Sequence, residues 1–202
     1  MRKIIVNTFL SLDGVMQAPG GPEEDPSGGF ELGGWSFNYW DDLMGKDMTD
    51  IMGKPFDLLL GRKTYEIFAA FWPTASEEQG AGPLNKATKY VVSNTLERAD
   101  WQPSHLIKGD VVAQIQHLKE QDGPELQVHG SANLLQTLIK HQLVDTYNLK
   151  IFPVLLGHGK RLFGEGAIPG GLRLVESKTS STGVIMATYE PAGAITPGSF
   201  AS

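Results

Sequence analysis

Cysteine is absent from the 202-residue sequence, so a disulfide framework, a cysteine nucleophile and a thiolate metal site are excluded. Long apolar runs are missing as well, and no window approaches the roughly 18 apolar residues that a membrane span needs. The apolar run near the N-terminus is too short, and too interrupted by polar residues, for a signal peptide. We therefore expect no membrane partner and a cytoplasmic location.

Positive charge is scarce and unclustered: the net charge is -6 at pH 7 and the sequence pI is near 5.3. Nucleic acids and anionic membranes are bound through clusters of Lys and Arg, so we expect no nucleic-acid partner. The five histidines are scattered with no carboxylate at ligand spacing, which disfavours a metal hydrolase and predicts no metal site. With 41% hydrophobic residues the chain can bury one sizeable core. We expect one domain over residues 1–190, a tail over residues 191–202, and a small-molecule substrate.

The most informative stretch is LQVHGSAN, residues 126–133, which leads into residues with helical apolar spacing. This pattern predicts a strand, a tight turn and a helix. The free N–H groups of a helix's first turn favour an anion, Gly130 permits close approach and Ser131 adds a hydroxyl. The stretch therefore predicts either a phosphate site or an ordinary connection with a Ser cap.

A second junction of the same kind follows residues 57–60, which form a short apolar strand ending in Gly61. The next helix opens on Arg62, Lys63 and Thr64. Cations at a helix N-terminus oppose the helix dipole, so their placement suggests a bound phosphate. The alternative is a pair of surface charges that acids elsewhere neutralise.

The remaining pattern alternates strands and helices. Strands are predicted at residues 3–10, 57–60, 89–94, 105–108, 126–130, 144–152, 172–177 and 184–190. Helices are predicted at residues 36–52, from residue 62, after Asp110 as the N-cap, and after residue 133 up to residue 142. Such alternation predicts an α/β domain with a mostly parallel sheet and a C-terminal antiparallel hairpin. Ligands bind at the carboxyl ends of parallel strands. Both junctions, Ser93, Asn94 and the long loop 17–34, expected to be a lid, belong to that edge.

The predicted helix 36–52 carries a carboxylate in an unusual place. Its N-cap is expected at Ser36 or Asn38, and Asp47 falls near the middle of its apolar arc. A buried carboxylate without a partner is costly, so Asp47 either meets a cation or lines a ligand cavity. Trp40, near the start of this helix, either stacks on a flat ring or belongs to the core.

Several stretches in order resemble the dihydrofolate reductase superfamily, and specifically its branch related to the C-terminal reductase domain of bacterial riboflavin biosynthesis. The resemblance is carried by SLDGV (11–15), DLLLGRKTYEIF (57–68), YVVSN (90–94), the stretch from HGSAN to GKRLF (129–163) and the closing hairpin. It covers residues 2–190. It implies a three-layer dihydrofolate-reductase-like fold, with NADPH as cofactor and a homodimer as the usual assembly.

The resemblance also implies roles for individual residues. The cofactor would be held by Gly61, Arg62, Lys63 and Thr64 at its phosphates, Ser93 and Asn94 at its adenosine, Gly130, Ser131, Ala132 and Asn133 at its pyrophosphate, and Leu12, Asp13 and Gly14 near its nicotinamide. Asp47 and Asp13 are the catalytic candidates, and Trp40 and Phe152 are the candidates for substrate binding.

The implied activity is hydride transfer from NADPH to a C=N or C=O bond of a small heterocyclic or sugar-derived substrate. Dihydrofolate and the ribosylaminopyrimidine of riboflavin synthesis are both possible substrates. Lys160 and Arg161 would favour the second if they bind a ribose phosphate. The alternative from another functional class is a non-catalytic protein that binds NADP(H) in the same cleft.

Overall fold

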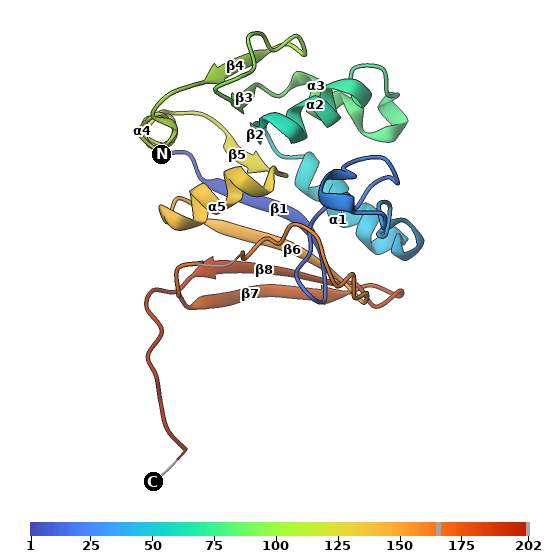
Figure 1. The fold of residues 1–202 in the computed structure, drawn as a ribbon, viewed down its shortest axis with the longest axis vertical. Coiled ribbons are helices and arrows are strands. Elements are labelled where there is room, and N and C mark those ends of the chain that lie inside the picture. The colour runs from blue at the N-terminus through green and yellow to red at the C-terminus, as the bar shows by residue number, and fades with distance from the viewer. Residues whose placement is uncertain (165–166, 201–202) are drawn as a thin grey trace.

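The computed structural model describes residues 1–164 and 167–200 (Figure 1). One sheet of eight strands runs in the order β4-β3-β2-β5-β1-β6-β8-β7. The strands are β1 (Ile4–Ser11), β2 (Phe56–Gly61), β3 (Lys89–Val92), β4 (Ser104–Ile107), β5 (Glu125–Val128), β6 (Thr146–Phe152), β7 (Leu172–Thr179) and β8 (Ile185–Pro191). The α-helices are α1 (Asp42–Met52), α2 (Arg62–Phe71), α3 (Ala81–Lys86), α4 (Val111–Glu120) and α5 (Ala132–Lys140).

The strands from β4 to β6 along the sheet pair in parallel, and β8 pairs antiparallel with both β6 and β7. The predicted α/β fold, with a mostly parallel sheet and an antiparallel end, is therefore confirmed. Parallel pairing places the carboxyl ends of β1, β2 and β5 along one edge. The chain segments that follow these strands are brought together there.

Helices cover both faces of the sheet, which gives three layers. On one face, Leu135 and Leu138 of α5 pack against Ile4 and Val6 of β1, and all four are fully buried. On the other face, α2 and α3 pack against β2, and α1 contributes Met44 to a separate apolar cluster. Burial of one such side chain stabilises the fold by about 1.5–3 kcal/mol.

Helix α1 begins later than its sequence pattern indicated. Its N-cap is Asp41, whose carboxylate accepts the Met44 N–H at 2.9 Å, so the predicted start at Ser36 or Asn38 is wrong. Ser36 instead donates its hydroxyl to the Pro19 carbonyl at 2.7 Å, which holds it against the long loop. The expected cap of the helix beginning after Asp110 is confirmed, because Asp110 accepts the Ala113 N–H at 3.0 Å.

The long loop 17–34 folds over the carboxyl edge of the sheet and is tied down by its own hydrogen bonds. The Gln17 side-chain amide donates to the Asp25 and Ser27 carbonyls, both at 2.9 Å. Trp35 donates its indole N–H to the Gln17 carbonyl at 2.8 Å. The loop is thus an ordered cover in this structure, and its motion as a lid stays a prediction.

The C-terminal residues 192–200 form no helix or strand and extend away from the sheet (Figure 1). Within the described part of the chain, every helix is too short or too polar to cross a membrane.

Candidate nucleotide-binding site

The two strand-glycine-helix junctions touch each other. The Gly61 N–H, at the end of β2, donates to the Gly130 carbonyl after β5 at 3.2 Å. A Cβ atom at Gly61 would overlap the Ser131 hydroxyl, and one at Gly130 would overlap the Thr64 hydroxyl. The Gly130–Ser131 peptide bond is cis. Glycine at both positions therefore allows the two backbones to approach this closely.

The helices that begin at these junctions lack side-chain caps. The N-cap of α2 is Gly61, which has no side chain, and the N-cap of α5 is Ser131, whose hydroxyl forms no hydrogen bond with the first turn. The first N–H groups of a helix have no partner within the helix, and the helix dipole makes that end positive. Two such ends, side by side with Lys63, form a site suited to phosphate groups.

A cavity of about 950 Å³ opens beside the junctions. Its lining combines residues from the junctions, the long loop, α1, α2 and the residues before α3: Lys63, Thr64, Gly130, Ser131, Ala132 and Asn133, with Gln17–Gly20, Met48, Thr49, Phe68, Trp72, Glu77 and Glu78 among the others. Of the cofactor residues expected from the sequence, Lys63, Thr64 and Gly130–Asn133 are thus brought to one cavity.

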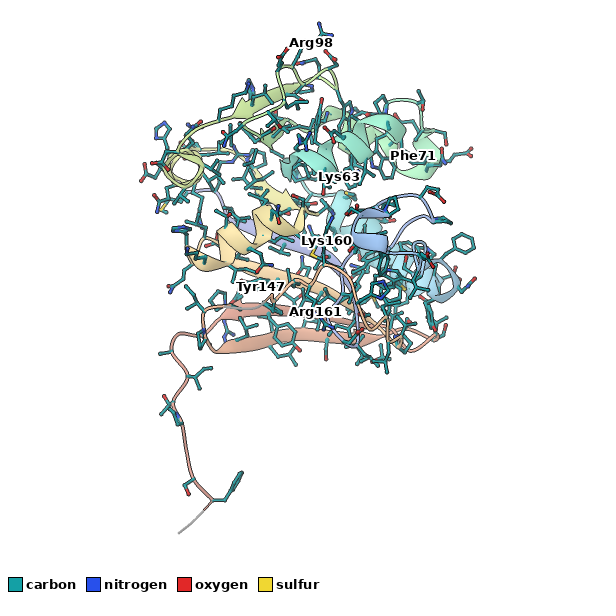
Figure 2. All side chains as sticks on the ribbon, viewed as in Figure 1. Lys63, Phe71, Arg98, Tyr147, Lys160 and Arg161 are labelled. Carbon is teal, nitrogen blue, oxygen red and sulfur yellow. The ribbon has the colours of Figure 1, made fainter. Side chains whose placement is uncertain are left out.

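Lys160 reaches the same cavity from the loop after β6, and Figure 2 shows it close to Lys63 in the view, between α5 and α1. Its ammonium group lies 2.5 Å from the Asp25 carboxylate and donates to the Ser27 hydroxyl at 2.8 Å. This pairing also lowers the pKa of Asp25 against the opposing effect of its burial. Lys160 is therefore neutralised by the long loop.

Other predicted cofactor residues lie outside the cavity lining. Arg62 is 3.5 Å from Glu66 one turn along α2. The Ser93 hydroxyl accepts two backbone N–H groups, from Thr95 and Leu96, and Asn94 accepts the Gly109 N–H at 2.9 Å. In these positions Ser93 and Asn94 shape the turn after β3.

Asp47 points away from the cavity. Its carboxylate lies 2.7 Å from the Lys150 ammonium group on β6 and 4.0 Å from that of Lys178 on β7. These groups line a separate, more polar cavity of about 360 Å³ on the other side of α1. Asp47 therefore meets a cation, as one of the two sequence interpretations predicted, and it does not line the larger cavity, so its catalytic role stays a prediction.

Asp13 also lies outside the cavity lining, where it joins two loops. Its carboxylate accepts the Ser11 hydroxyl at 2.6 Å and the backbone N–H groups of Leu156 and Gly157 at 3.1 and 2.8 Å. The Ser11 hydrogen bond is the main cause that lowers the pKa of Asp13 to about 2. Arg161 donates to the Asp13 carbonyl, so it belongs to the same contact between the two loops. Leu12 and Gly14, the neighbours of Asp13, do not line the cavity either.

The two aromatic candidates for substrate binding differ in position. Trp40 lines the cavity, with its ring centroid 6.2 Å from that of Phe9. Phe152 has no exposed surface and packs against Phe9, Trp35 and Tyr39. Phe152 is therefore a core residue, which contradicts its predicted contact with substrate.

Sequence reasoning missed two polar residues of the cavity. His129 lines the cavity beside Phe68, and the loss of solvent around its ring lowers its pKa to about 4, with Lys150 adding to the effect. Asn7 on β1 also lines it. A polar side chain on a buried strand was the available signal for Asn7.

The chain is similar in sequence or in fold to several known proteins. The curated protein YyaP of Bacillus subtilis (strain 168) is 29% identical over 196 residues, which cover 93% of this chain and 94% of that protein. Dihydrofolate reductase from Enterococcus faecalis, solved in complex with NADP(H), is 15% identical with a TM-score of 0.58, covering 94% of this chain and 96% of that one. A bifunctional deaminase and 5-amino-6-(5-phosphoribosylamino)uracil reductase from Thermotoga maritima is 14% identical with a TM-score of 0.62, covering 95% of this chain and 57% of that one.

The two solved structures share the fold with this chain, which makes the fold dihydrofolate-reductase-like. The family model of the RibD C-terminal domain matches residues 2–186, nearly the whole of the region that forms the sheet and its helices. The chain therefore belongs to the RibD C-terminal domain family, whose fold and reductase-like character agree with the resemblance in the sequence.

Proposed function

We propose that the chain is an NADPH-dependent reductase acting on a C=N or C=O bond of a small heterocyclic substrate. The observation that carries the proposal is the contact between Gly61 and Gly130, which aims the open N-termini of α2 and α5 at one cavity. NADP(H) in the structurally similar dihydrofolate reductase agrees with it. When bound, the cofactor supplies the hydride, and the substrate also takes up a proton.

The residues of the site suit a phosphorylated dinucleotide. The first-turn N–H groups of α5, with the Ser131 and Thr64 hydroxyls, would hold the pyrophosphate. Lys63 lines the cavity and forms no ion pair within residues 1–164 and 167–200, so its charge is available to a further phosphate. Arg62, exposed one residue earlier, would add a weaker contribution. The loop 17–34 would exclude water from the reacting bond.

The test is calorimetric titration of the purified protein with NADPH and with NADH. We expect tighter binding of NADPH, and we expect Lys63→Ala to remove most of that preference because one charge-assisted contact contributes about 1.5–3 kcal/mol. Arg62→Ala should reduce it less. Equal binding of both cofactors by the wild-type protein, or of neither, would contradict the proposal.

Lys46→Ala is the matched control for these variants. Lys46 is an exposed helix cation that pairs with Asp50 one turn later, just as Arg62 pairs with Glu66, but it does not line the cavity. Its replacement should leave the cofactor preference unchanged. If the wild-type protein binds NADPH but oxidises it with no candidate substrate, the non-catalytic NADP(H)-binding alternative is favoured.

We also propose that the protein forms a homodimer through the outer strand β7. This strand presents Leu172, Leu174 and Val175 with 42–50% of their surface exposed, which is unusual for apolar residues on a sheet edge. Light scattering should give twice the monomer mass. Leu174→Arg should return the protein to a monomer, whereas Leu155→Arg, at an exposed site elsewhere, should not.

A further inference from the structure

The cavity has two ends of different chemical character. The outer end holds the junctions, and the inner end lies between α1, α2 and α3. Lys63 is the second residue of α2 and Trp72 follows its last residue, which separates them by about 13 Å along the helix axis. The inner lining is formed mainly by Met48, Met52, Phe68, Trp72, Glu77 and Glu78. Substrate would lie in this inner end, because the junctions would hold the cofactor's phosphates.

The inner end lacks positive charge. The cations that line the cavity from the described residues are Lys63 and Lys160. Lys160 belongs to the outer end, because the segment after it is held against α5 by Gln136, which donates to the Arg161 and Leu162 carbonyls. It is also paired with Asp25. The inner end instead carries the exposed carboxylates Glu77 and Glu78.

Two polar groups that line the cavity from the sheet, His129 next to Gly130 and Asn7 on β1, are neutral. His129 has a pKa lowered to about 4, so its ring is uncharged at pH 7. Asn7 offers an amide whose orientation is fixed by a chain of hydrogen bonds. The Thr188 hydroxyl donates to Asn148 Oδ1 at 3.0 Å, and Asn148 Nδ2 donates to Asn7 Oδ1 at 2.9 Å.

These hydrogen bonds leave the Nδ2 group of Asn7 without a partner among the described residues, although Asn7 is only 6% exposed. A buried N–H donor favours any ligand that supplies an acceptor. A ring nitrogen or a carbonyl oxygen of a heterocycle is an acceptor of the right kind, and the aromatic side chains of Phe68 and Trp72 suit a flat ring.

From these observations, and resting on the proposed function, we infer that the substrate is a planar heterocycle with a neutral hydrogen-bond acceptor and without a phosphate group. A substrate phosphate in the inner end would meet Glu77 and Glu78 and no lysine or arginine from the described lining. Like charges that face each other across a binding site oppose binding. An uncharged or cationic ring meets no such barrier.

The test compares two probes that differ by one phosphate: 6-hydroxymethyl-7,8-dihydropterin, which has a reducible C=N bond, and its phosphate monoester. Each is titrated calorimetrically into the protein in the presence of saturating NADP⁺. We expect the unphosphorylated pterin to bind at least about tenfold more tightly, since like-charge contacts discriminate strongly. Equal or tighter binding of the phosphate monoester, or binding of neither probe, would overturn the inference.

Charge removal sharpens the test. The double variant Glu77→Gln with Glu78→Gln should narrow the ratio of the two affinities to about threefold or less. The matched control is Glu97→Gln with Glu120→Gln, two exposed acids outside the cavity lining, which should leave the ratio unchanged. An unchanged ratio in the first double variant would contradict the role of these acids.

A third variant addresses Asn7. Asn7→Asp retains the shape of the side chain but replaces the N–H donor with an acceptor, so pterin binding should weaken more than about tenfold. The NADPH titration of the wild-type protein distinguishes a failure of the proposed function from a failure of this inference. No NADPH binding would refute the proposed function itself, whereas NADPH binding with a preference for the phosphorylated probe would refute this inference alone.

Discussion

Two pairs of helices in this protein begin in opposite ways. Asp41 caps α1 and Asp110 caps α4, each by accepting a first-turn N–H at about 3 Å. Helices α2 and α5 begin at Gly61 and Ser131 without a side-chain cap. First-turn residues of the uncapped helices α2 and α5 line the large cavity, whereas the capping residues and first residues of α1 and α4 do not. A helix end that its own chain leaves open remains available to an anionic ligand.

The largest combined effect on stability and cofactor binding is expected from Gly61→Ala, which tests whether the contact between the uncapped ends is necessary. A Cβ atom there would overlap Ser131, so we expect the free energy of unfolding to fall by about 1–3 kcal/mol. NADPH affinity should fall at least about tenfold, because one lost charge-assisted contact is sufficient for that. Urea unfolding and calorimetry measure the two effects.

Gly45→Ala is the control for this substitution. Gly45 lies inside α1, and a Cβ atom there would meet only ordinary van der Waals contact with Trp40. Alanine should therefore raise the free energy of unfolding by about 0.4–1 kcal/mol through its better helix propensity. If Gly61→Ala behaved like Gly45→Ala, the two junctions would not need their close approach.

The next prediction compares a substitution at a capped helix start with one at an uncapped start. Asp110→Ala should lower the free energy of unfolding by about 1 kcal/mol, because the Ala113 N–H loses its partner. It should leave NADPH affinity unchanged. Ser131→Ala should do the reverse, with little change in stability and a several-fold loss of NADPH affinity. The comparison between the two pairs of helices would be wrong if both substitutions changed the same quantity.

Much of this arrangement could be predicted from the sequence, because its causes are local. Asp110 stands directly before a helical apolar pattern, and its cap was predicted correctly. The two strand-glycine-helix patterns were also visible, and parallel strands place such junctions at one edge. Their hydrogen bond further requires that β2 and β5 be neighbours, although α2, α3, β3, β4 and α4 lie between them in the chain.

The errors involve contacts between distant segments. The start of α1 was misplaced because Ser36, a good cap residue, bonds the carbonyl of Pro19 in the long loop instead. For Asp47 the apolar arc left two partners open, a cation or a ligand, and the cation proved to be Lys150 of β6. Helical periodicity identifies a buried carboxylate correctly and gives no information on which distant side chain faces it.

The ion pair of Asp47 gives a prediction that separates the two cavities. Lys150 is almost fully buried, so Asp47→Ala should leave a poorly compensated charge and lower the free energy of unfolding by about 2–3 kcal/mol, with NADPH affinity unchanged. Asp50→Ala removes an exposed partner of Lys46 on the same helix, and should lower the free energy of unfolding far less than Asp47→Ala does. A specific loss of turnover in Asp47→Ala, without loss of stability, would restore a catalytic role to Asp47.

The last prediction concerns pH and His129, which lies immediately before the uncapped start of α5. Its folded-state pKa of about 4 is below the ordinary value of 6.5, so between these values the unfolded chain binds more protons than the folded one. Stability from this group is complete above pH 6.5 and is lost as the pH falls towards 4. His129→Gln should therefore make urea unfolding less dependent on pH, by at most one proton, within this window. His105→Gln, an exposed histidine on β4, is the control and should retain the wild-type slope. An unchanged slope in His129→Gln would mean that the ring is already protonated in the folded protein, and a second positive group would then stand beside the open helix ends.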